Sequence, residues 1–513
     1  MTDSLSLSIP EQHDYTDPTV ERDVDRLHHW LTNLPLMDVV ETVRLVLGAL
    51  DALNEQKLPA GQRFQYLEVY RATAQRLFVT VDPLHLRQLA LTKAQRQEAI
   101  DGVEQLLLSI AGGYKLIVVE LYQSSGDGEP EPLFGQAINR VLEQLVYSLL
   151  DCYRFYRAVQ PQLIVESHQL YRLARHHGLL GYCVDEGDEH TPATSVAMLY
   201  HASMLLSLTD PFRLAEGEVG LLFDVLMQHA AVCRIIPGNS WTGNGEGLYL
   251  IELGSDKLPV PCNKLEPPVK TSDPYLLDAT AALSAVRERL AKTPAKVRMQ
   301  SPEAMVLRRL LPETQGTDKR REQRSSDSRW VNLLLGVTVI HQYLMRTARK
   351  EPGLSAAEGS GQPGELIICR VLDSSQNGMK LAWDDSGAGD ARVGDLLGII
   401  EGQGSRQSLL LAMIRSIRVY REGGMEAGVQ LMPGGLGPVT CHLAEQPDQV
   451  GARALFMPAS ETEQFTATLV TGKGLYEEGR HLLIDVGGRE VKARAGRSVL
   501  DSPVFDRFEF SAE

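Results

Sequence analysis

Two short clusters of polar residues have the types and spacing needed to bind an anionic, planar ligand. Arg320 and Arg324 stand four residues apart in a basic stretch, and Asp373, Ser375 and Gly378 form the pattern D-x-S-x-x-G. A guanidinium group makes forked, charge-assisted hydrogen bonds to phosphate oxygens, and its plane can stack on a base. Asp, Ser and Gly are also common turn residues, so neither cluster identifies a site by itself.

Short predicted strands surround both clusters and would position them. Their density, and the β-branched residues among them, indicate a small barrel or sandwich. The expected strands cover residues 330–337, 365–372, 379–383, 395–400, 409–420 and 427–432. The D-x-S-x-x-G pattern would form the turn between the second and third of them. Between the first and second, a helix and a Gly- and Ser-containing linker occupy about residues 340–364.

In their order and strand context the two clusters resemble the PilZ domain, the bacterial receptor module for cyclic di-GMP. The resemblance covers about residues 318–435 and implies a six-stranded antiparallel β-barrel. Arg320 and Arg324 match the arginines of a loop that precedes the first strand and wraps the ligand. The resemblance implies that Asp373 accepts a hydrogen bond from a guanine N–H group and that Ser375 also binds the ligand. Gly378 would permit a positive φ or a close backbone approach.

Three later stretches also match patterns of the PilZ family. Residues 394–397 match a G-[DE]-x-[LV] strand start, 414–417 an I-R-x-[IV] strand and 428–431 a final G-[VI]-x-[FL] strand. One departure concerns the interval from Arg324 to Asp373, which is 373 − 324 = 49 residues and longer than in a compact PilZ domain. An insertion at 340–364 accommodates it, because loop-closure entropy grows only logarithmically with length. If the arginines do not reach the turn, the barrel is a degenerate PilZ that contacts proteins.

The rest of the chain divides by pattern into a long helical part and a second β-rich part. Apolar residues recur at helical intervals in 39–50 and 138–156, and similar segments fill most of the first 300 residues. These helices would pack as one domain or stack as repeats. After residue 440, alternating segments and the Gly487-Gly488 turn indicate another β unit, which could extend the barrel or form its own module.

The predicted fold class is therefore α+β and multi-domain. An N-terminal all-α helical domain precedes a PilZ-like six-stranded antiparallel β-barrel and a C-terminal β unit. The expected boundaries are a flexible acidic tail at 1–25, the helical domain at 26–312 with a small hairpin near 247–262, an Arg-rich linker at 313–329, the barrel at 330–440 and the C-terminal module at 441–513.

Composition limits the possible partners and location. The 513-residue chain has 51 Lys and Arg against 66 Asp and Glu, a formal charge of −15, which argues against general affinity for nucleic acid. Its six cysteines are scattered without C-x-x-C spacing, as suits a reducing compartment. We found no signal-peptide pattern and no apolar run near the ~20 residues that span a bilayer. The chain is therefore expected to be cytoplasmic, without a membrane span.

A metal site and a catalytic site are not expected. His176, His177, Cys183 and the acidic stretch up to His190 have the composition of a metal site but no ligand spacing typical of zinc, so a solvated acidic loop is the preferred interpretation. We found no G-x-S-x-G or H-E-x-x-H motif and no comparable catalytic arrangement. The chain is predicted not to be an enzyme and to need no cofactor.

The sequence leaves two functional hypotheses. In the first, the chain is a signalling receptor whose cyclic di-GMP ligand orders the Arg-rich linker and relays binding to the helical domain or a protein partner. In the second, a degenerate barrel and a helical scaffold hold other proteins together without a nucleotide. PilZ proteins include monomers and dimers, so the resemblance implies no single oligomeric state.

Overall fold

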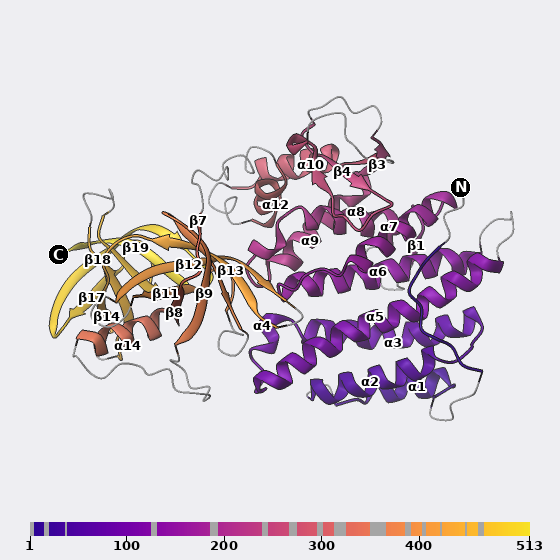
Figure 1. Ribbon diagram of the computed structural model, residues 1–513, viewed down its shortest axis with the longest axis horizontal. Helices are drawn as coiled ribbons and strands as arrows, with labels where there is room; N and C mark the ends of the chain where they lie inside the picture. Colours follow the sequence, from indigo (N-terminus) through magenta and orange to yellow (C-terminus); the bar gives the residue numbers. More distant parts are fainter. Residues whose placement is uncertain are drawn as a thin grey trace. The chain divides into compact units, whose positions relative to one another are not determined.

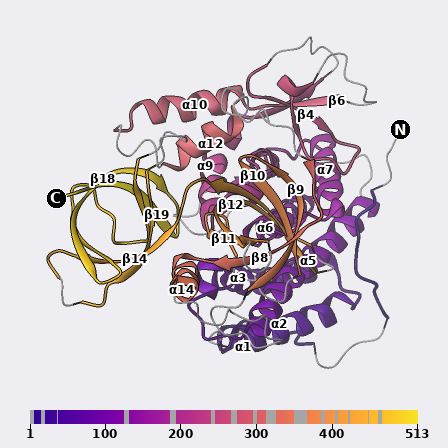
Figure 2. The same cartoon turned by 60° about the vertical axis from the view of Figure 1, so that its left-hand side comes forward.

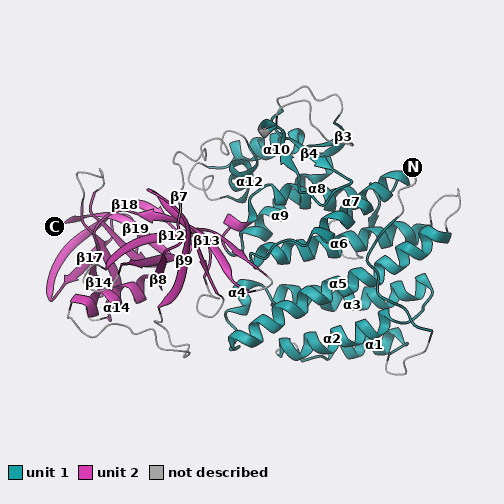
Figure 3. Ribbon diagram, in the orientation of Figure 1, with its two compact units in different colours: residues 1–211, 216–319 teal, residues 212–215, 320–513 magenta. Residues whose placement is uncertain are grey.

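The computed structural model divides into two compact units, a helical unit of residues 1–211 and 216–319 and a barrel unit of residues 212–215 and 320–513 (Figures 1 and 3). The predicted α+β multi-domain class is confirmed. The described residues are 5–14, 20–35, 38–124, 131–184, 193–238, 245–265, 274–294, 301–311, 325–348, 366–384, 391–402, 407–420, 423–446, 449–459 and 466–513.

The centre of the helical unit is the pair of long helices α5 and α6, which pack along each other. Helices α2 and α3 cover α5, while α7 and α8 cover α6. Asp38 caps α2 by accepting a hydrogen bond from the Glu41 N–H. The helix bounds are α1 Val24–Thr32, α2 Val39–Asn54, α3 Ala60–Thr80, α4 Pro83–Leu86, α5 Lys93–Ser124, α6 Pro132–Arg154, α7 Pro161–His176, α8 Val196–Ser207, α9 Glu218–His229, α10 Thr280–Ala291 and α12 Pro302–Leu310.

Helix α5 is long and apolar enough to cross a membrane by length and composition alone. Charged residues interrupt its apolar sequence, so it contains no long continuous apolar run. However, 72% of its most apolar window is buried inside the protein. A central core helix passes the same test as a membrane span, so this feature is weak evidence for one.

The helical unit also contains strands, so it is not entirely α. The expected hairpin near 247–262 is β4 with β5, and it belongs to a four-stranded sheet of order β3-β6-β4-β5. Strands β3 and β6 were not predicted, because each is short and follows a helical or proline-rich stretch. The strands are β3 Arg234–Pro237, β4 Leu248–Glu252, β5 Val260–Pro261 and β6 Pro274–Asp278, with a two-residue ribbon of β1 Cys183–Val184 and β2 Thr194–Ser195.

The first barrel is closed by six antiparallel strands in the cyclic order β8-β9-β10-β13-β12-β11, which confirms the predicted barrel. Closure follows because β9 pairs with both β8 and β10, and β11 pairs with β8. A short extra strand, β7, also pairs with β9. The strands are β7 Ser325–Ser326, β8 Trp330–Leu335, β9 Ile367–Ser375, β10 Gly378–Trp383, β11 Leu396–Glu401, β12 Ser408–Val419 and β13 Met425–Met432.

The C-terminal β unit is a second closed barrel in the order β14-β15-β16-β19-β18-β17 (Figure 2). This β unit therefore closes on itself and adds no strand to the first barrel, while both barrels belong to the same compact unit. Its first strand, β14, was not predicted, because its first half contains glycine and proline. The strands are β14 Gly437–Leu443, β15 Ala452–Met457, β16 Thr468–Gly472, β17 His481–Val486, β18 Arg489–Asp501 and β19 Phe505–Ala512.

Helix α14, Val337–Ala348, lies between the two barrels and gives them a shared core. Ile340 is fully buried in a cluster with Leu334 from the first barrel and Leu455 and Phe505 from the second. A hydrogen bond from Ser502 Oγ to the Gly394 carbonyl oxygen, 2.9 Å long, adds a polar contact between the barrels. The expected insertion therefore begins with a packed helix; its remainder, 349–365, lies outside the described residues.

A buried acid in α6 generates a prediction about stability. Asp151 is 1% exposed, and its carboxylate oxygens have no hydrogen-bond partner among the described residues. Burial raises the pKa of this carboxyl from an ordinary 3.8 to about 7, although Arg154 and Arg157 oppose the rise. The folded state therefore holds a proton that the unfolded chain has already lost between about pH 4 and pH 7.

We expect Asp151→Asn to stabilise the helical unit at pH 8 and to have little effect near pH 4. Wild-type stability should fall as pH rises toward 7, and since one pKa unit corresponds to ~1.4 kcal/mol, the loss is up to ~4 kcal/mol. Urea unfolding between pH 5 and pH 8 measures this difference, with the exposed Asp25→Asn as a control. Parallel pH profiles for wild type and Asp151→Asn would contradict the prediction.

Candidate ligand-binding site

The D-x-S-x-x-G pattern forms the tip of a β-hairpin, as predicted. Strand β9 ends at Ser375, a two-residue turn of Gln376 and Asn377 follows, and β10 begins at Gly378. Ser375 Oγ donates a hydrogen bond of 3.3 Å to the carbonyl oxygen of Gly378, which joins the two sides of the turn. Two of the three predicted positions are therefore in direct contact.

Gly378 is required for close packing of strands rather than for a positive φ. A Cβ atom at this position would lie 2.6 Å from the carbonyl oxygen of Val429 on β13, far inside contact distance. Its φ is not among the positive values found in the described chain. Of the two roles that the sequence allowed for this glycine, the structure shows the close backbone approach.

A β-bulge sets the direction of Asp373. Lys380 pairs with Asp373 while Leu381 pairs with Val371, so Leu372 is an extra residue in β9. Cys369 and Val371 point into the core, whereas Asp373 is partly exposed and faces the same side as its partner Lys380. The bulge therefore turns the Asp373 carboxylate to the outer face of the barrel, as bulges near sites often do.

Strand β7 brings the chain that carries the two arginines to this hairpin. Ser325 pairs with Ser374, and Ser326 pairs with Asp373. Arg320 and Arg324 themselves lie outside the described residues, but Arg324 is bonded directly to Ser325. The structure thus places the end of the Arg-rich linker beside the D-x-S-x-x-G hairpin, although 49 residues separate the motifs in sequence.

The link between β7 and β8 follows the same edge of β9. The Asp327 N–H donates to the Leu372 carbonyl oxygen at 3.2 Å, and the Val371 N–H donates to the Arg329 carbonyl oxygen at 2.9 Å. Strand β8 then pairs with Ile367–Arg370. Strands β7 and β8 therefore follow each other along the same edge of β9, and both run antiparallel to it. The register of β8 against β9 thus fixes where the linker ends.

Side chains missed by the sequence analysis hold this link in place. Ser374 Oγ donates to Asp327 Oδ2 at 3.3 Å, and Arg329 forms ion pairs of 2.7 Å with both Asp327 and Glu401. The hydrogen bond from the Arg329 backbone N–H is the largest cause of a lowered pKa for Asp327, so this carboxyl favours its charged form. In sequence, these residues looked like part of a solvated linker.

The outer face next to Asp373 continues across β10, β13 and β12. Lys380 pairs with Gly428 and forms an ion pair of 2.6 Å with Glu426. A Cβ at Gly428 would lie 2.6 Å from Ser416 Oγ, so the strand carries no side chain at that point. Arg415, at a second bulge, donates from Nε to Gln430 Oε1 at 2.8 Å. This face combines cationic groups with a point at Gly428 where the Ser416 hydroxyl lies against the backbone.

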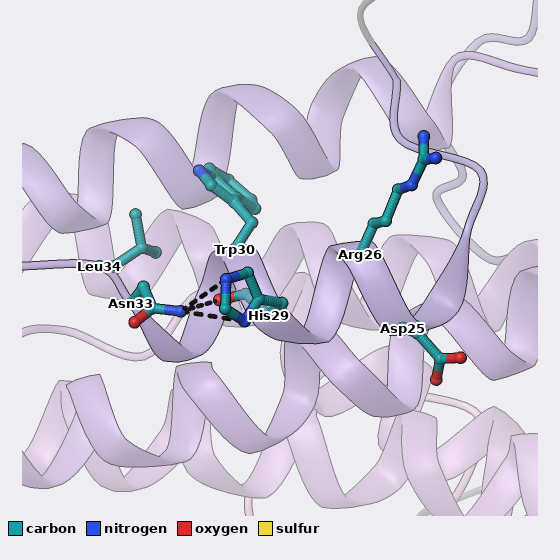
Figure 4. A pocket seen from close by; sticks show the side chains of 6 residues that line it. All are labelled: Asp25, Arg26, His29, Trp30, Asn33 and Leu34. Atoms are coloured by element: carbon teal, nitrogen blue, oxygen red, sulfur yellow. Dashed lines mark hydrogen bonds between the residues drawn. The ribbon is translucent and has the colours of Figure 1, made fainter.

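Other regions of the described chain have fewer features of a ligand-binding site. A shallow depression along α1 is lined by Asp25, Arg26, His29, Trp30, Asn33 and Leu34 (Figure 4). The Asn33 amide donates to the His29 carbonyl oxygen at 2.7 Å and also contacts the His29 ring, and the depression contains none of the predicted site residues. Among the described residues no group of three or more His, Cys, Asp or Glu could hold a metal ion. Residues 185–190 of the acidic stretch lie outside the described chain.

Comparisons with known proteins identify relatives of both ends of the chain. Residues 25–238 match the family model of the N-terminal domain of the cyclic-di-GMP receptor FimW, and residues 441–512 match that of the FimW C-terminal β-barrel domain. The chain is similar to FimW. The cyclic-di-GMP receptor FimW of Pseudomonas aeruginosa PAO1 is 23% identical over 577 residues, which cover 99% of this chain and 94% of the relative.

The FimW comparison refines the resemblance seen in the sequence. Neither FimW domain model covers residues 318–435, so the PilZ resemblance of that stretch depends on its own motifs and on the closed six-stranded barrel. The helical part and the second barrel, for which the sequence had suggested no relative, are the parts that the two FimW models match.

The packing of the hairpin tip leads to a prediction. Gly378→Ala should destabilise the first barrel by ~1–3 kcal/mol, because the new methyl group would clash with the Val429 carbonyl and force β10 away from β13. Gly472→Ala is the matched control, since a Cβ there meets nothing within 4 Å. Thermal and urea unfolding measure both variants. Equal stability of the two would show that the strands separate without cost.

Proposed function

We propose that this chain is a cyclic di-GMP-binding receptor and that the ligand binds the outer face of the first, PilZ-type barrel. Arg320 and Arg324 would bind its phosphates and stack on its bases, while Asp373, Ser375 and Gly378 would form the floor of the site. The similarity to the cyclic-di-GMP receptor FimW along almost the whole chain supports the choice of ligand.

The pairing of β7 with β9 is the observation that carries the proposal. Consecutive Cα atoms are about 3.8 Å apart, so Arg324 lies within that distance of Ser325, which pairs beside Asp373. Five residues extend at most ~18 Å, and a long arginine side chain adds to this reach for Arg320. Under this proposal both guanidinium groups would contact a ligand on the hairpin, despite the long interval in sequence.

The chemistry of the face suits a cyclic dinucleotide. Charge-assisted hydrogen bonds from arginine to phosphate are among the strongest in proteins. Asp373 would provide an acceptor for a guanine N–H group, beside the cationic side chain of its strand partner Lys380. Because the whole chain carries a formal charge of −15, attraction of an anion must come from a local cationic cluster such as this one.

The relay would act through the linker itself. The boundary between the two compact units falls between Lys319 and Arg320, so the proposed ligand-binding arginines lie in the segment that connects them. When a ligand holds this segment on the barrel, less of the linker remains free to move. Ligand binding then favours the arrangements of the helical unit that this shorter free linker permits. Ligand binding could thereby change which surface the helical unit presents to a protein partner.

This proposal implies binding and signalling in place of catalysis. We also propose a cytoplasmic location, which the scattered cysteines without C-x-x-C spacing support, since they suit a reducing compartment.

The first test is calorimetric titration of the full chain with cyclic di-GMP, with GTP as the specificity control. We expect Arg320→Ala with Arg324→Ala to weaken binding at least 100-fold, because each lost charge-assisted hydrogen bond costs ~1.5–3 kcal/mol. Lys319→Ala with Arg321→Ala is the matched control, since it removes the same charge from the same linker. Equal losses in the two variants would indicate only general attraction. No binding by the wild type would favour the protein-scaffold alternative.

A second test concerns the residues that position the linker. Ser374→Ala removes the hydroxyl that holds Asp327, so the linker should become less ordered and cyclic di-GMP affinity should fall about fivefold, which is ~1 kcal/mol. Ser328→Ala is the control, because Ser328 is exposed and adjacent in sequence. A Ser374→Ala variant with wild-type affinity would exclude a positioning role for this contact.

A further inference from the structure

The N-terminal residues 5–14 lie as an extended segment against the helical unit (Figure 1). The segment was expected to be part of a flexible tail, yet it contacts three helices or their ends. The Ser6 N–H donates to Gln169 Oε1 of α7 at 3.1 Å, and the His13 N–H donates to the Glu55 carbonyl oxygen after α2 at 2.7 Å. Between these points the segment crosses α5 at Gly112.

The strongest contact joins Ser8 to a buried ion pair. Its N–H and its hydroxyl both donate to Glu166 Oε1, at 2.7 and 2.9 Å. The other oxygen of Glu166 pairs with Lys115 Nζ at 2.5 Å, and these two side chains are only 1% and 4% exposed. A buried charge is costly unless its hydrogen-bonding capacity is satisfied, and Ser8 supplies two of the donors for this carboxylate.

A second contact is steric. A Cβ at residue 112 would lie 3.2 Å from both Cδ and Cγ of Pro10, so glycine in the middle of α5 makes room for the proline ring. Glycine inside a helix costs about 1 kcal/mol relative to alanine. The helical unit therefore contacts the segment at two specific positions, which we call the segment site. Glu166 accepts from the serine, and Gly112 makes room for the proline two residues later.

The occupant itself is held lightly. None of residues 5–14 is buried, and Ile9 is 43% exposed, so little apolar surface stabilises the segment in place. Segments with few buried apolar contacts open at low free-energy cost. In addition, Gly112, Lys115 and Glu166 lie within the matched FimW N-terminal domain, residues 25–238, whereas residues 5–14 precede it. The contacted residues of the segment site thus lie within the range that the family model matches, and the segment lies outside that range.

We propose that the segment site is a docking site for an extended Ser-x-Pro segment of a protein partner, and that residues 5–14 occupy it as an intramolecular competitor. The partner segment would donate its serine hydroxyl and N–H to Glu166 and place its proline over Gly112. A tethered segment competes at an effective concentration of about millimolar, so it would exclude weak partners until it is released. This proposal is independent of nucleotide binding at the barrel.

The test uses the full-length chain with the segment released by substitution. Ser8→Glu places a second carboxylate beside Glu166, and Pro10→Ser removes the proline ring without changing Glu166 or Lys115. Hydrogen exchange of residues 5–14 reports release, and fluorescence anisotropy measures binding of a labelled peptide that copies residues 4–15. We expect both variants to bind the peptide at least tenfold more tightly than the wild type.

Matched controls define the outcomes. A peptide with alanine in place of either Ser8 or Pro10 should lose binding, and Gly112→Ala added to Ser8→Glu should abolish uptake of the intact peptide. If hydrogen exchange shows that the segment is released but the peptide does not bind, the docking site is wrong. If the segment stays protected from exchange in both variants, Ser8 and Pro10 do not hold it in place. Dimers formed by exchange of the segment, seen by light scattering, would identify a second copy as the occupant and overturn the partner proposal.

Discussion

The backbone pairing of β7 with β9 is the contact on which the proposed ligand site depends. It consists of two residue pairs, but it continues the longer pairing of β8 with the same edge of β9. The cost of ordering the linker is therefore shared with formation of the barrel itself. Ser374, Asp327 and Arg329 add side-chain contacts at the interruption between β7 and β8. A linker that looks polar and unstructured in sequence thus ends at a fixed register.

Much of the first barrel could be predicted because its strands show the signals that strands normally show. The alternation in β9, the turn residues after it and the apolar stretch of β8 all indicated local structure that the fold confirms. The site was harder to predict, since distance along the chain is a poor guide to distance in a sheet. The insertion between β8 and β9 lengthens the interval between the motifs without changing which residues pair. Arg320 and Arg324 as ligand-binding residues remain predictions.

Other features left no local signal. Strand β14 begins with glycine and proline, and it exists because β15 and β17 provide partners on both edges. In the sheet of β3 to β6, the β4–β5 hairpin was predicted, but β3 and β6 are too short for periodicity to identify. The bulge at Leu372 depends on pairing with β10, so the outward direction of Asp373 could not be derived from the alternation of β9 alone. In each case tertiary pairing decided the local structure.

The position of α14 affects which fragment of the barrel unit could fold by itself. Its buried face is built from Val337 and Ile340, and the surfaces that cover it come from both barrels. The PilZ-like stretch of residues 318–435 therefore does not correspond to a self-sufficient piece of protein. Cut at residue 435, it would expose to water the side of α14 that β15 and β16 now cover. Such a fragment would be prone to aggregation, and a minimal soluble fragment would have to extend through β19 to Ala512.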